Sequence, residues 1–155
     1  MLAVLQRINK ATVYADGILS GSIGRGLYIL LGVEKGDDAV DAELLCEKIS
    51  KLRIFSDENG KMNLSVKDVG GEVLVVSNFT LLANYAHGNR PDYFNAAEPT
   101  VANSLYQHFV LCMRDKTERV ETGKFGSDMR SEIETDGPVT IIMNSKLLRR
   151  PKHDT

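Results

Sequence analysis

The sequence predicts a fold of the α/β class, of the α+β type: one domain, with an antiparallel, barrel-like sheet and two main helices packed on it. Three observations support this prediction. The 155 residues suffice for one domain with a proper core but leave no length for a second. Short β-branched and aliphatic runs outnumber the helical patterns. Most of these runs follow one another through tight turns, which is too many hairpins for a doubly wound fold.

The predicted strands are short apolar runs bounded by turn residues. In order, they lie at residues 2–8, 11–14, 18–19, 27–33, 53–55, 61–64, 73–77, 130–134 and 139–143. Asp16-Gly17 gives a strong type I′ hairpin signal after the second run. The glycine-rich segment 20–26 lacks the Lys-Ser/Thr ending of a phosphate-binding loop, so hairpin glycines are the better interpretation.

Two segments carry the 3.6-residue period of an amphipathic helix. The first begins at Asp37-Asp38, whose charges suit a helix N-terminus, and runs to about Leu52. The second begins at Pro99-Thr100 and places Tyr106, Phe109 and other apolar residues on one face. We expect both helices to cover the sheet.

The run 73–82 organises the rest of the chain. It begins as an aliphatic strand, and Ser77, Asn78 and Thr80 then introduce polar groups into an apolar context. A buried hydroxyl or amide costs roughly 1–3 kcal/mol unless it finds a partner. These side chains therefore either belong to a hydrogen-bonded turn between core strands or line a site.

A second candidate is the segment Asp136-Gly137-Pro138, which interrupts the last predicted hairpin. An ordinary β-turn explains it, since Asp, Gly and Pro are all turn residues. An X-Pro bond is also the only common place for a cis peptide in proteins. The sequence leaves both interpretations open.

Conventional catalytic and metal-binding patterns are absent from the sequence. His87, His108 and His153 have no partners at metal-ligand spacing, so we expect no metal and no cofactor. There is no Gly-x-Ser-x-Gly elbow and no loop cysteine beside a histidine. Cys46 and Cys112 fall inside the predicted helices and read as reduced core residues of a cytoplasmic protein.

The bulk composition is that of an ordinary soluble protein, 43% hydrophobic and 26% charged. No apolar run approaches the roughly 18–20 residues of a membrane span, so we expect no membrane association. The net charge of −2 argues against wide nucleic-acid binding and against DNA as a partner. A small basic patch that handles one end of an RNA stays possible.

Three blocks occur in a specific order: Ser-x-Phe-Thr-Leu at 77–81, Gly-x-Phe-Gly-x-Asp-Met at 123–129 and Gly-Pro-Val-Thr at 137–140. With them the chain resembles the D-aminoacyl-tRNA deacylases nearly end to end, as far as about Met143. The matching pieces are residues 6–7, 11–13, 32–35, 53–57, 60–63, 75–77, 79–81, 88–91, 105–106, 123–126, 128–129 and 137–140. The resemblance implies a homodimeric, barrel-like protein that cleaves D-amino acids, and also glycine, from mischarged tRNA.

The resemblance also assigns roles to residues. It implies that Gly137-Pro138 is a cis pair that reaches into the partner subunit's pocket and excludes an L side chain. The backbone around Phe79 and Thr80, with Ser77 and Asn78 beside it, would then surround the reacting ester. The Thr80 hydroxyl is a candidate nucleophile, proton relay or structural group, and with no adjacent base we favour the latter two.

The remaining candidate residues have competing explanations. Phe125 and Met129 either line the pocket or pack in the core. Arg7, Lys124 and Arg130 are candidate tRNA phosphate contacts, and each of them also suits a solvated surface. The predicted domain ends at residue 144, and 145–155 is expected to form a mobile basic tail.

Two departures from the family pattern bear on function. Asn78 stands where the family usually has Gln, and Thr135 where it usually has Asn. We expect Asn78, one methylene shorter, to lose or water-bridge a hydrogen bond. The alternative function is a non-catalytic binder of charged tRNA ends on the same scaffold, and a third possibility is an editing relative that acts on other mischarged tRNAs.

Overall fold

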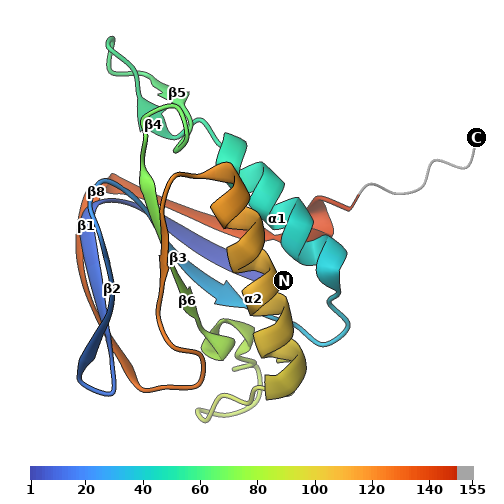
Figure 1. Cartoon of the computed structure of the whole chain (residues 1–155). Helices are drawn as coiled ribbons and strands as arrows, with labels where there is room; N and C mark the ends of the chain where they lie inside the picture. The colour runs from blue at the N-terminus through green and yellow to red at the C-terminus, as the bar shows by residue number, and fades with distance from the viewer. Residues whose placement is uncertain (150–155) are drawn as a thin grey trace, which may run out of the picture.

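The computed structural model describes residues 1–149 and confirms the predicted fold class, with two helices against a curled sheet (Figure 1). Its strands are β1 (Leu2–Ala15), β2 (Ile18–Ile23), β3 (Gly26–Gly32), β4 (Phe55–Ser56), β5 (Met62–Leu64), β6 (Glu72–Ser77), β7 (Val120–Thr122) and β8 (Met129–Asn144). Its helices are α1 (Ala39–Lys51) and α2 (Pro99–Lys116), with 3-10 turns η1 (Phe79–Leu82) and η2 (Ser145–Leu147).

The main sheet is mixed, which corrects the expectation of a purely antiparallel one. Its strand order is β2-β1-β3-β6-β7, with β8 paired to β1. The pairs β3–β6 and β6–β7 are parallel. Parallel neighbours need a long crossover, and α1 and α2 each lie within one of these two connections (Figure 1).

The sheet curls until its two ends meet. The Ser20 hydroxyl on β2 donates to the Thr122 carbonyl of β7 across 2.8 Å, which joins the first and last strands of the order. One hydrophobic core fills the space between the sheet and the helices, and Tyr106, Phe109 and Phe55 are its largest fully buried side chains. A second, smaller core lies around Ile8 and Leu74.

Two predicted strand breaks lie inside continuous strands. Asn9-Lys10 belongs to β1, and the segment 136–138 belongs to β8. The two strands pair along most of their length, and register shifts between Gln6 and Lys10 accommodate the Gly-Pro segment opposite. Proline is tolerated at such a place because β-bulges and edge strands do not require its missing N–H.

Both predicted helix starts are confirmed. Asp38 caps α1, accepting from the Val40 N–H at 2.9 Å, while Asp41 accepts from the Asp38 N–H at 2.9 Å. This reciprocal pair satisfies N–H groups that the helix itself cannot. Pro99 occupies the first turn of α2, where its lack of an N–H costs nothing. Across residues 1–149, neither helix has the length and apolar character to cross a membrane.

The expectation of a tail starting at residue 145 is wrong for its first five residues. Ser145 is fully buried, and its hydroxyl donates to Asp41 at 2.7 Å. Arg149 binds the same carboxylate, with Nε at 3.1 Å and Nη2 at 2.8 Å. The Met1 amino group also donates to the Ser145 hydroxyl, at 2.9 Å. Residues 145–149 are therefore part of the folded unit, and the rest of the expected tail lies outside the described residues.

Candidate functional site

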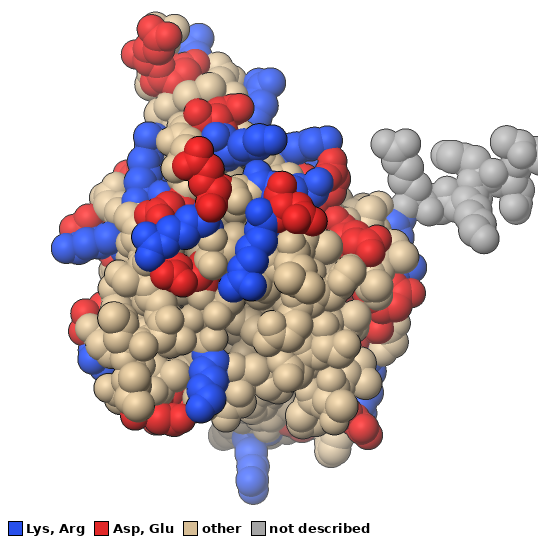
Figure 2. Space-filling view, in the orientation of Figure 1, with Lys and Arg blue, Asp and Glu red and all other residues tan. Residues whose placement is uncertain are grey.

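A cavity of about 960 Å³ opens where β6 ends, between η1, the start of α2 and the segment before β8. The end of the molecule that carries η1 and the start of α2 shows few charged side chains on the face seen in Figure 2. Six of the predicted site residues line the cavity: Ser77, Asn78, Phe79, Thr80, Phe125 and Met129. The structure thus brings together two segments almost fifty positions apart in the chain.

Asn78 shapes the turn that follows β6. Its backbone N–H donates to the Leu31 carbonyl at 2.8 Å, which fixes the strand end to β3. Its side-chain oxygen caps η1 and accepts from the Thr80 N–H at 3.1 Å and from the Thr80 hydroxyl. The shorter amide thus forms a direct hydrogen bond to Thr80, and whether it loses a bond that the family's Gln would make stays a prediction.

The backbone N–H groups of the turn are unequally available. The Thr80 N–H is taken by the Asn78 side chain, whereas within residues 1–149 the Phe79 N–H has no acceptor. An open backbone N–H at a cavity wall is the kind of donor that stabilises a developing oxyanion. Of the two amides that the sequence singled out, Phe79 is therefore the one free to act.

The opposite wall is aromatic and apolar. The rings of Tyr106 and Phe125 lie 6.0 Å apart, and Phe125 and Met129 are half-buried against the two cores. Both residues therefore pack in a core and line the cavity, so the two interpretations hold together. Gly123 makes room for Met129, since a Cβ there would lie 2.5 Å from its sulfur.

The sequence did not identify several residues of the cavity. Tyr28 and Ser131 share a hydrogen bond of 2.7 Å at the cavity wall, and burial, partly offset by Ser131, raises the pKa of the Tyr28 hydroxyl. A hydroxyl within the apolar strand 27–33 was the signal available for Tyr28. Tyr93, Phe94 and other residues before α2 also line the cavity but carry no pattern beyond that of a loop.

Gly137 and Pro138 do not line the cavity of their own chain. Both are exposed on β8, their peptide bond is cis, and Gly137 has a φ of +128°. Arg7 braces the segment: its Nε lies 3.1 Å from an Asp136 carboxylate oxygen, and its Nη1 donates to the Ile54 carbonyl at 2.8 Å. The turn is therefore presented outward from a fixed base.

This geometry corrects the expectation for Arg7. Its side chain is only 11% exposed and is already bound to Asp136 and Ile54, so it holds the turn and is not open to a phosphate. Lys124 and Arg130 are exposed, as a phosphate contact requires. Arg130 already pairs with Glu132 at 2.5 Å and lies 4.4 Å over the Tyr14 ring.

Thr135 lies on β8 opposite Ile8, exposed to solvent. Nothing in the structure explains the choice of this residue.

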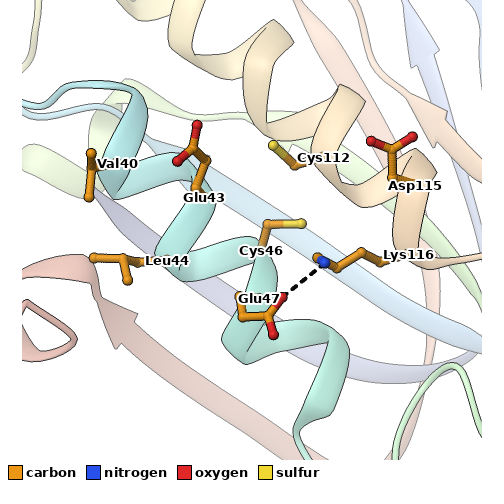
Figure 3. Close-up of a pocket in the computed structure, with 8 residues that line it drawn as sticks. All are labelled: Val40, Glu43, Leu44, Cys46, Glu47, Cys112, Asp115 and Lys116. Carbon is orange, nitrogen blue, oxygen red and sulfur yellow. Dashed lines mark ion pairs between the residues drawn. The ribbon is translucent and has the colours of Figure 1, made fainter.

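A smaller hollow of about 470 Å³ lies between α1 and α2 and holds both cysteines (Figure 3). Cys46 and Cys112 are free thiols, and burial, together with the neighbouring Cys112, raises the pKa of Cys46 to about 12. A thiol that stays protonated is a poor nucleophile. In the part of the chain that the structure describes, no three His, Cys, Asp or Glu side chains are placed to hold a metal ion.

Comparisons with known proteins agree with the fold. A model of the D-Tyr-tRNA(Tyr) deacylase family matches residues 4–144. A D-aminoacyl-tRNA deacylase of Anaeromyxobacter dehalogenans (strain 2CP-C) is 53% identical, with 96% of this chain and 99% of the relative covered.

Two solved structures share the fold. A c-Myc DNA unwinding element binding protein is 39% identical with a TM-score of 0.87, covering 93% of this chain and 98% of that one. A probable eukaryotic D-amino acid tRNA deacylase is 15% identical with a TM-score of 0.77, covering 92% and 97%. The family match over residues 4–144 and the 53% identity to a curated relative place this chain in the D-Tyr-tRNA(Tyr) deacylase family.

Proposed function

We propose that this chain hydrolyses the ester of D-aminoacyl-tRNA to a free D-amino acid and tRNA. The observation that carries the proposal is the cavity at the end of β6, which combines an open Phe79 N–H with apolar walls and lies on a scaffold of this family. The names of the relatives supply the substrate class. The aminoacylated 3′ end of the tRNA enters this cavity.

Modest catalysis by the protein is enough for this reaction, because an aminoacyl ester is already reactive. A water molecule adds to the ester carbonyl, the Phe79 N–H stabilises the oxyanion, and the ribose oxygen of the tRNA leaves with a proton. The ribose hydroxyl next to the ester is available to assist the proton transfer. This scheme needs no catalytic triad.

Chiral selection, in this proposal, comes from a second copy of the chain. The segment Gly137-Pro138 is exposed, lies outside its own cavity and is held by Arg7. A fixed turn that enters the partner's cavity would bind the α-amino group through its carbonyls and leave no room for an L side chain. Such an exchange requires a two-fold homodimer. The 78% exposed Ile142 on β8 offers apolar surface for it.

The direct test is a side-by-side deacylation panel with purified protein. D-Tyr-tRNA should be hydrolysed over many turnovers while L-Tyr-tRNA stays intact, and Gly-tRNA(Ala) should be cleaved because glycine has no side chain to reject. Equal cleavage of the D and L forms would overturn the proposal. Binding of charged tRNA without turnover would instead support the alternative of a non-catalytic binder.

A Thr80→Ala substitution separates two roles for the hydroxyl. Within residues 1–149 the Thr80 hydroxyl has one hydrogen-bond partner, the Asn78 side-chain oxygen, an acceptor that is not a base. We expect the variant to keep D-Tyr-tRNA hydrolysis within about tenfold of the wild type in single-turnover rates. A well-folded variant with a loss of roughly 10²-fold or more would show that the hydroxyl transfers a proton or attacks the ester.

A further inference from the structure

Exposed aromatic rings lie at the cavity and in the loop that leads to it. Phe79 and Phe94 both line it, yet they are 60% and 75% exposed. Tyr93 packs edge-on against Phe79 with ring centroids 5.0 Å apart. Tyr85, 81% exposed, lies in the loop that leads from η1 to Tyr93. Large apolar groups left in water beside a cavity indicate a contact surface.

The backbone that carries these rings is anchored. Asn84 and Asp92 exchange backbone hydrogen bonds of 2.8 and 3.0 Å, which closes the loop that holds Tyr85. The Asp92 side chain accepts from the Phe94 N–H at 3.3 Å, and the Asn95 carbonyl accepts from the Lys35 N–H at 2.9 Å. The rings are therefore presented on a fixed edge.

We infer that Tyr85 and Phe94 form a stacking platform for the unpaired nucleotides just upstream of the aminoacylated adenosine. The inference rests on the proposed function. If the ester lies in the cavity, the nucleotides joined to it must leave across the cavity's rim. Single-stranded RNA is recognised largely by stacking of its bases on aromatic side chains.

The position of the rim favours a nucleic-acid strand over a second copy of the chain as the occupant, because the nucleotides joined to an ester in the cavity must cross it. Lys35 lines the cavity mouth and is exposed, and Arg90 is exposed in the same closed loop as Tyr85. Cations beside stacked rings suit the phosphates that link successive bases. The rim thus offers ring faces for bases, and Lys35 and Arg90 are available to phosphates on a rim whose lining also holds the acidic Glu98 and Asp128.

The test compares a long and a minimal substrate. The wild type, Tyr85→Ala, Phe94→Ala and the aromatic-conserving Phe94→Tyr are assayed on D-Tyr-tRNA and on D-tyrosyl adenosine, which lacks the upstream nucleotides. Each alanine variant should raise KM for the tRNA about tenfold more than KM for the adenosine ester. Phe94→Tyr should restore the wild-type ratio. Leu111→Ala, which removes an exposed apolar side chain from α2, is the matched control and should leave the ratio unchanged.

The outcomes separate this inference from the proposed function. Wild-type protein that cleaves neither ester would defeat the proposed function itself. Wild-type cleavage of both esters with no differential change in the alanine variants would defeat the stacking platform alone. Conversion of the alanine variants to monomers in light scattering would show that the rings contact a second copy, which would also overturn the inference.

Discussion

A Gly137→Ala substitution should lower the ratio of D-Tyr-tRNA to L-Tyr-tRNA hydrolysis at least about tenfold. Gly137 has a φ of +128°, which L residues rarely adopt, and an added Cβ would lie 2.9 Å from the Val139 nitrogen and 3.3 Å from the Arg7 guanidinium. Such a conformation costs a non-glycine residue roughly 1–3 kcal/mol. The segment must therefore shift, and with it the group proposed to exclude L side chains.

The measurement is the single-turnover rate for each stereoisomer, with circular dichroism to confirm folding. Gly60→Ala is the matched control, because Gly60 has a φ of +75° with open space around it and lies between β4 and β5. It carries the same kind of backbone penalty without touching the turn. An unchanged D-to-L ratio in a folded Gly137→Ala variant would remove the turn from chiral selection.

An Asp41→Asn substitution should lower the free energy of unfolding by about 3 kcal/mol at pH 7. The buried Asp41 carboxylate accepts from Ser145, from two Arg149 nitrogens and from the Asp38 N–H. Removing one partner of a buried charged network leaves the other groups unsatisfied. Urea unfolding measures the loss, and Asp38→Asn is the control. Asp38 is exposed and asparagine caps a helix equally well, so that variant should change by less than about 1 kcal/mol.

The same carboxylate predicts how stability depends on pH. Burial raises the pKa of Asp41, but hydrogen bonds from Arg149, the Asp38 N–H and Ser145 outweigh it and hold the pKa far below its usual value. A group whose pKa is lowered by folding stabilises the folded state at pH values above its unfolded pKa, about 3.9 for Asp. This stabilisation is lost as the pH falls below that value. The difference in free energy of unfolding between the wild type and Asp41→Asn should therefore become smaller as the pH is lowered from 5 to 2. A gap that stays constant over this range would contradict the assignment.

Local patterns in the sequence predicted the elements better than their arrangement. The starts of α1 and α2 followed from the cap residue Asp38 and from Pro99 in the first turn of α2, both of which are local signals. The many predicted hairpins favoured antiparallel pairs, so the parallel pairing of β3 with β6 was not predicted. The position of α1 between these two strands was the available signal, because parallel neighbours need a long crossover. The continuity of β8 through Pro138 depends on pairing with β1, more than a hundred residues away.

The candidate site was also predictable only where a local sequence pattern marked its residues. Ser77, Asn78 and Thr80 stood out as polar groups after an aliphatic strand, and they do line the cavity. The sequence made Arg7 a candidate for a phosphate contact or a solvated surface position, because nothing near it in the chain indicates Asp136, its partner across the sheet. Phe94 has no sequence pattern beyond that of a loop residue, since only the fold places it at the cavity.

The most direct test of a pocket shared between two chains is a heterodimer with one working cavity. One subunit carries Ala102→Trp, which fills its cavity, and the other carries Gly137→Ala. Tandem affinity purification with two tags isolates the mixed dimer, whose only open cavity then faces an intact turn from its partner. If the pocket is shared, this dimer hydrolyses D-Tyr-tRNA and rejects L-Tyr-tRNA as the wild type does. Hydrolysis of both stereoisomers, as expected of the Gly137→Ala homodimer, would show that each cavity depends on its own chain's turn and would contradict a shared pocket.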